Sequence, residues 1–72
     1  MLLERLKNFR LASGFTCQQM AEKMGLTKST YHKKECGKIK ISLLDAQKIS
    51  KILGRSIDDI FFYSINDIKR QD

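Results

Sequence analysis

The chain has 72 residues, enough for one small domain and too few for two domains with separate hydrophobic cores. Hydrophobic residues make up 42% of it and are spread along its length, which argues against a disordered tail and favours a packed globule. The formal net charge of +6 favours an anionic partner, either the phosphates of a nucleic acid or an anionic membrane surface.

Neither the N-terminus nor the cysteines indicate export. The segment Met1-Leu2-Leu3 is followed at once by charged residues at positions 4, 5 and 7, so it forms neither a signal-peptide core nor a membrane span. Nothing in the spacing of Cys17 and Cys36 marks the disulfide framework of a secreted protein. We therefore expect a cytoplasmic protein with two free thiols.

Apolar side chains recur at helical spacing along the chain, and no segment shows the alternation of a half-buried strand. There is no proline, and the glycines at positions 14, 25, 37 and 54 lie where successive helices are expected to end. The sequence therefore predicts an all-α fold with five short helices in one domain over residues 1–63. Residues 64–72 are expected to form a C-terminal tail or an extension of the last helix.

The first helix is predicted from about Leu2 to Ser13, with Leu3, Leu6 and Phe9 buried. Thr16 and Gln19 have the spacing of a capping box, which predicts a second helix from there to Met24. This second helix is expected to bury Met20, Ala21 and Met24.

After Gly25, Thr27 is expected to cap a third helix that reaches about Cys36. Ser42 and Asp45 repeat the capping-box spacing and predict a fourth helix that buries Leu43, Ala46, Ile49 and Leu53. Ser56 and Asp59 do the same for a fifth helix through Phe62.

The second and third predicted helices are joined by a tight glycine turn, the arrangement that places the second of two helices in a DNA major groove. The region from Lys28 to Lys40 carries five lysines against the single acid Glu35. At 100° per residue, one face of the third helix carries polar residues that suit base edges and phosphates: Lys28, Ser29, His32, Lys33 and Cys36. The opposite face, with Thr30, Tyr31 and Lys34, is expected to meet the core. The alternative is an ordinary solvated polar face.

Several motifs, in order and at matching spacing, resemble the phage Cro and repressor family of helix-turn-helix proteins. They are Arg10, Gly14, Phe15-Thr16, the run MAEKMGLT at 20–27, Ser29-Thr30, Glu35-x-Gly37-Lys38, and the later segment from Ile49 to Phe61. The resemblance covers most of Leu3 to Phe62. It implies a compact five-helix, lambda-repressor-like DNA-binding domain that reads double-stranded operator DNA, usually as a homodimer.

The resemblance also implies roles for individual residues. Lys28, Ser29 and Lys33 would read bases, His32 would be a further candidate, and Lys38 and Lys40 would contact phosphates from the following loop. Gln18 and Thr27 complete the expected DNA-binding set. Arg10 and Glu35 occupy the positions of an ion pair that ties the first helix to the end of the third.

The chain departs from the family pattern at two positions. Cys17 stands where the family usually opens the second helix with a glutamine that grips phosphate, so that contact would fall to Gln18 or to a backbone amide. Lys34 stands on the inner face, where relatives carry an aliphatic residue. We expect its stem to pack while its ammonium reaches outward.

The sequence gives little support for chemistry at the site. His32 and Cys36 lie one helical turn apart and could supply two metal ligands, with Cys17 a third, but a fourth has no obvious source. There is no phosphate-cradling glycine loop and no supported catalytic arrangement. We therefore expect no metal, no cofactor, no small-molecule ligand and no enzymatic activity.

The run Phe61-Phe62-Tyr63 cannot point entirely into one small core, so we expect at least one of its rings to be exposed or at a subunit interface. The residues predicted for a homodimer contact are Ile57, Phe61 and Tyr63. The alternative is that an aromatic ring of this run belongs to the monomer core.

The prediction for function is a Cro-like repressor from a phage or similar mobile element, because a chain of this length lacks the second domain of longer phage repressors. Two alternatives remain open at this stage. One is the DNA-binding antitoxin of a two-gene operon. The other is a protein-interaction module whose basic face meets an acidic partner. A basic amphipathic membrane binder fits less well, because the apolar face is needed for the core.

Overall fold

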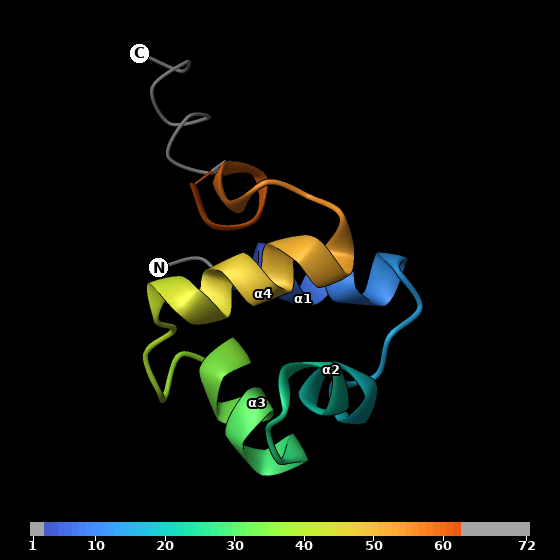
Figure 1. Ribbon diagram of the computed structural model, residues 1–72, viewed down its shortest axis with the longest axis vertical. Coiled ribbons are helices and arrows are strands. Elements are labelled where there is room, and N and C mark those ends of the chain that lie inside the picture. The colour runs from blue at the N-terminus through green and yellow to red at the C-terminus, as the bar shows by residue number, and fades with distance from the viewer. Residues whose placement is uncertain (1–2, 63–72) are drawn as a thin grey trace.

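A computed structural model of the chain describes residues 3–62 (Figure 1). The predictions made for Leu2, for Tyr63 and for residues 64–72 lie outside the described residues. The described part consists of four α-helices and a π-helical turn, in agreement with the predicted all-α class. In chain order these are α1 (Glu4–Ala12), α2 (Cys17–Met24), α3 (Lys28–Glu35), α4 (Leu43–Leu53) and the turn η1 (Asp58–Phe62). None of these helices is long and apolar enough to cross a membrane.

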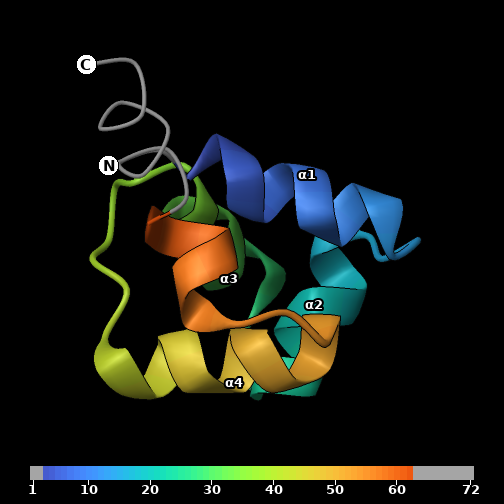
Figure 2. The same cartoon turned by 90° about the horizontal axis from the view of Figure 1, so that it is seen from above.

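The helices are stacked so that α1 and α4 form a central layer. Figure 1 shows α2 and α3 on one side of this layer and η1 on the other, and Figure 2 shows η1 between the two central helices when seen from above. The helix pair α2 and α3 packs together closely, and α1 contacts both α3 and η1. The turn between α2 and α3 therefore lies at the far end of the molecule from η1.

Each of the five elements places one side chain at the centre of the core. Leu6, Met20, Tyr31, Ile49 and Ile60 are the largest fully buried side chains and come from α1, α2, α3, α4 and η1 in turn. Burial of an apolar side chain of this size stabilises the fold by about 1.5–3 kcal/mol. Because every element contributes to one shared core, α3 is fixed relative to all the others.

The sequence signals for helix ends correspond to observed caps. Thr16 and Gln19 form the complete capping box of α2, and Ser42 and Asp45 form that of α4. The α2 helix ends at Gly25, whose φ of 73° lies in the left-handed region that favours glycine. Each capping box satisfies two of the amides at the start of its helix, so α2 and α4 begin where the sequence predicted.

Two burial predictions are wrong and one element differs in type. Leu43 is 70% exposed because it lies roughly a quarter turn around α4 from the buried face formed by Ala46, Ile49 and Leu53. Phe61, expected at a subunit contact, is only 6% exposed and belongs to the monomer core. The fifth helix is a π-helical turn, although Ser56 caps it as predicted by accepting a hydrogen bond from the Asp59 amide at 3.0 Å.

Candidate nucleic-acid interface

The turn that joins α2 to α3 is built by local hydrogen bonds. The amide of Leu26 donates to the carbonyl of Ala21 at 2.8 Å, which closes α2 behind Gly25. The Thr27 hydroxyl oxygen then accepts from the Thr30 amide at 3.1 Å and starts α3. With Leu26 packed against the core, these bonds set the direction in which α3 leaves the turn.

The outer face of α3, as defined by the residues that point to solvent, has the composition predicted for it. Lys28, Ser29, His32 and Lys33 are all exposed, and so is Cys36 just after the helix. The inner face carries Tyr31 and Glu35, which are buried, with Thr30 and Lys34 half-buried beside them. One short helix thus separates its core contacts from a basic polar surface.

The starts of α2 and α3 border the same hollow. Cys17, Gln18 and Lys28 line it together with the chain between α1 and α2. Gln18 is exposed and donates from Nε2 to the Glu22 carboxylate at 3.0 Å. An anion in this hollow would meet the free amides of α2 and the ammonium of Lys28 together.

A loop of residues 37–42 follows α3 and carries two exposed lysines, Lys38 and Lys40. The amide of Lys38 donates to the carbonyl of Lys33 at 2.8 Å, so the start of the loop is fixed to the last turn of α3. Lys40 lines a broader groove with His32 and Cys36. The structure therefore brings the candidate phosphate contacts of the loop next to the outer face of α3.

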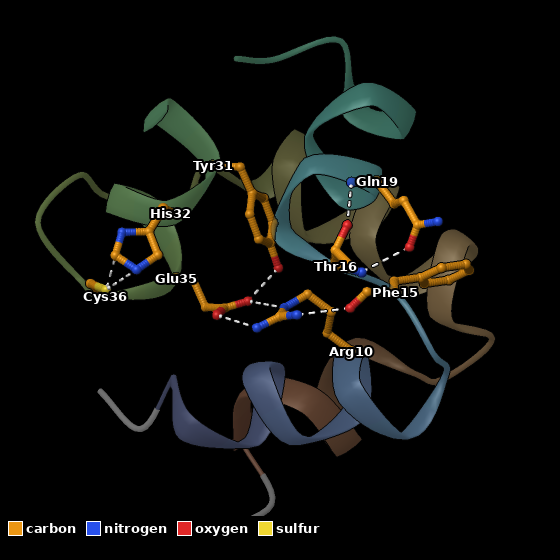
Figure 3. Close-up of polar contacts among 8 residues, drawn as sticks. All are labelled: Arg10, Phe15, Thr16, Gln19, Tyr31, His32, Glu35 and Cys36. Atoms are coloured by element: carbon orange, nitrogen blue, oxygen red, sulfur yellow. Dashed lines mark hydrogen bonds and ion pairs between the residues drawn. The ribbon is translucent and has the colours of Figure 1, made fainter. Parts of the chain in front are cut away.

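Arg10 and Glu35 form the ion pair that the family resemblance implies (Figure 3). The guanidinium donates from Nε to Glu35 Oε2 at 2.8 Å and from Nη2 to Oε1 at 3.1 Å, a two-bond arrangement in which both side chains are about 95% buried. Its third donor, Nη1, binds the carbonyl of Phe15 at 2.8 Å. One side chain of α1 thereby holds the end of α3 and the approach to α2.

Tyr31 completes this network from within α3. Its hydroxyl donates to Glu35 Oε2 at 2.7 Å, and its ring is fully buried (Figure 3). Across residues 3–62, every buried side-chain nitrogen or oxygen has a hydrogen-bond partner. The buried charges of Arg10 and Glu35 are therefore compensated, which is the condition under which such groups are tolerated in a core.

The network changes the pKa values of its members. Burial acts to raise the pKa of the Glu35 carboxyl, but the hydrogen bonds from Arg10 and Tyr31 outweigh it and hold the pKa below its usual range. Burial, followed by the bond to the Glu35 carboxylate, raises the pKa of Tyr31. The hydrogen bond to Glu35 raises the pKa of Arg10. Arg10 and Glu35 are therefore charged, and Tyr31 is neutral, at physiological pH.

The two thiols of the described chain are free, and one of them contacts a histidine. Cys17 and Cys36 are both free, and Cys36 Sγ lies 3.5 Å from Nε2 of His32. Within the described residues, no three side chains of the metal-binding types come together. Figure 3 shows the His32–Cys36 contact at the C-terminal end of α3.

The sequence missed three contacts of the site. The Tyr31–Glu35 bond has a visible signal, since the two residues are four apart on one helix face. The bond from Arg10 to Phe15 and the ion pair between Lys34 and Asp45 have none. Lys34 and Asp45 lie in different helices and meet across the loop that joins α3 to α4.

Of the predicted dimer contacts, Ile57 is half-buried against the core and Phe61 lies within it. Phe62 is 43% exposed and is therefore the aromatic side chain that η1 presents to solvent. The site residues predicted for DNA contact, by contrast, are all exposed.

Comparison with known proteins identifies the architecture. The family described as helix-turn-helix matches residues 6–60. An SPbeta prophage-derived uncharacterized HTH-type transcriptional regulator of Bacillus subtilis is 44% identical over 76% of this chain. The match covers 51% of that relative, so this chain spans about half its length.

Archaeal relatives are similar over more of their length. An uncharacterized HTH-type transcriptional regulator of Methanocaldococcus jannaschii is 39% identical over 82% of this chain and 89% of the relative. Another from Archaeoglobus fulgidus is 31% identical over 89% of this chain and 91% of the relative. No solved structure gave a significant match.

Proposed function

This chain belongs to the helix-turn-helix family, and from that premise we propose that it is a Cro-like repressor that binds double-stranded operator DNA and regulates transcription. The observation that carries the proposal is the outer face of α3. It is exposed, basic and polar, while the inner face of the same helix is fixed in the core. A prophage-derived protein among the relatives supports an origin in a phage or similar element.

In the proposed complex, α3 lies in the major groove. Lys28 and Lys33 donate to guanine O6 and N7, and Ser29 and His32 are suited to further base edges. Thr27, just before the helix, and Gln18, at the start of α2, lie at the rim of this surface. Gln18 would have to exchange its bond to Glu22 for a phosphate.

Lys38 and Lys40 would neutralise phosphates from the loop. Such contacts release counterions, so the affinity should fall by about 0.9 decade per decade of salt for each phosphate neutralised. A flat salt dependence would contradict DNA as the partner. The relatives are named as regulators, and we propose no catalytic activity and no cofactor for this chain.

We also propose that the working unit is a homodimer. One short recognition helix contacts only a few base pairs, and paired half-sites are the common way to a longer site. Ile57 and the exposed Phe62 offer apolar surface at and just before η1, outside the outer face of α3 that is proposed to bind DNA. Such a protein acts on DNA in the cytoplasm.

The test is selection of bound duplexes from a random pool. The selected sites should share one sequence and be near-palindromic, with half-site centres about 10 base pairs or a multiple apart. Lys33→Ala should change the preferred bases, whereas Lys51→Ala, which removes an exposed lysine of α4, should not. Failure to enrich any sequence would reject operator binding, and an asymmetric site bound by one subunit would reject the dimer.

A further inference from the structure

Lys34 connects the end of α3 to the loop that follows it and to the start of α4. Its ammonium donates to Asp45 Oδ2 at 2.8 Å and to the carbonyl of Lys40 at 3.3 Å. The two charged side chains are only 14% and 16% exposed. Lys34 therefore contacts the loop of residues 37–42 and the start of α4 from the end of α3.

Asp45 also forms hydrogen bonds with Ser42 at the start of α4. The same Oδ2 atom accepts from the Ser42 amide at 3.1 Å, and the Asp45 amide donates to the Ser42 hydroxyl at 3.1 Å. Partial burial acts to raise the pKa of this carboxyl, but the hydrogen bonds from Lys34 and Ser42 hold it below its usual range. The end of the loop is thus fixed to a carboxylate that Lys34 also holds.

Hydrogen bonds fix the loop of residues 37–42 at both ends and in the middle. The amides of Lys38 and Ile39 are bonded to the carbonyl of Lys33, and the amide of Ser42 is bonded to Asp45. Between these points, Lys34 holds the backbone of Lys40. The two exposed lysines of the loop lie within the span that these bonds fix.

We propose that Lys34 is a positioning residue for DNA binding: by pairing with Asp45 and with the Lys40 carbonyl, it holds the loop so that Lys38 and Lys40 face the phosphates. This inference rests on the proposed operator binding. It assigns to Lys34 a role through the loop and not a contact of its own with DNA. An ordered loop binds more tightly because less conformational entropy is lost on binding.

For a change at Asp45, electrostatics alone and the positioning role of Lys34 predict opposite effects on DNA affinity. Asp45→Asn removes a negative charge near the basic surface, so electrostatics alone predicts tighter binding to DNA. Loss of the negative charge that pairs with Lys34 predicts weaker binding. The asparagine side-chain oxygen can still accept from the Ser42 amide, which preserves the helix cap.

The experiment measures the affinity of the full chain for its selected duplex. Lys34→Leu and Asp45→Asn should each weaken binding about two- to fivefold, the range that corresponds to one partly exposed ion pair. The double variant should bind no more weakly than Lys34→Leu alone, and Lys34→Arg should bind like the original chain. Asp58→Asn, which removes an exposed acid of η1, is the matched charge control and should not weaken binding.

A readout without DNA separates this proposal from operator binding itself. Hydrogen exchange at the Ile39 and Ser42 amides should be faster in Lys34→Leu than in the original chain, measured at a temperature where both chains remain folded. Tighter or unchanged binding by Asp45→Asn, or unchanged exchange in Lys34→Leu, would overturn the positioning role. If the original chain binds no duplex selectively, operator binding fails instead, whatever the exchange shows.

Discussion

The inner and outer faces of α3 use the same helix for opposite purposes. On the inner face, Tyr31 and Glu35 are buried and their polar atoms are fully paired. On the outer face, Lys28 and Lys33 are exposed. The contrast teaches that stability and recognition are carried by different side chains of one eight-residue helix, so each is open to change without the other.

The largest effect is expected from Arg10→Met, which breaks the ion pair on the inner face. It leaves the buried Glu35 carboxylate without its cation and the Phe15 carbonyl without its donor. The free energy of unfolding should fall by about 3–5 kcal/mol, measured by urea denaturation. Lys7→Met, which removes an exposed cation from the same helix, should change it by less than about 0.5 kcal/mol. A loss under about 1 kcal/mol for Arg10→Met would show that the pair behaves like an exposed one.

A smaller loss is expected from Tyr31→Phe, which removes only the hydroxyl on the same face. The ring remains in the core, but Glu35 Oε2 loses the bond from Tyr31. A hydrogen bond to a charged group contributes about 1.5–3 kcal/mol, so the free energy of unfolding should fall within that range. Leu44→Ala, a truncation at a side chain that is 60% exposed, should have much less effect. Equal effects of the two changes would remove the distinction between buried and exposed positions.

Acid should lower the free energy of unfolding, and by less than either substitution. The pKa of Glu35 and that of Asp45 are both lowered in the folded protein. The unfolded chain then binds protons more readily, so stability is fully present above the usual carboxyl pKa of about 4 and is lost as pH falls below it. Unfolding measured between pH 7 and pH 3 should show this loss, and Asp45→Asn should reduce it. Constant stability down to pH 3 would contradict the pairing of both carboxylates.

The sequence predicted the inner and outer faces of α3 with unequal success. The helical wheel placed Tyr31 inward and Lys33 outward, because the fixed step of 100° per residue determines the direction of both side chains. The caps at Thr16 and Ser42 were also readable, since they depend on residues three apart. Local spacing was therefore sufficient for the helices and for the solvent-facing set.

What the sequence could not give depends on packing between distant segments. Lys34 was expected to reach outward, but its ammonium is held by Asp45, eleven positions away across a loop. Phe61 was expected at a partner surface, and its ring fills the monomer core. In both cases the outcome was decided by how α4 and η1 meet the rest of the fold, and no local pattern encodes that.

The smallest effect on stability is expected on the outer face, from Lys28→Ala. Lys28 is the first residue of α3, where a positive charge opposes the helix dipole and costs about 0.3–1 kcal/mol. Alanine should therefore leave the free energy of unfolding unchanged or raise it by a few tenths of a kcal/mol, measured under the same conditions as Arg10→Met. The same variant should lose about 1–3 kcal/mol of discrimination at one base position of the selected site. Lys48→Ala, at an exposed lysine of α4, serves as the control for DNA preference. A uniform loss of affinity for every duplex would make Lys28 a phosphate contact, and a loss of stability would show that the outer face also supports the fold.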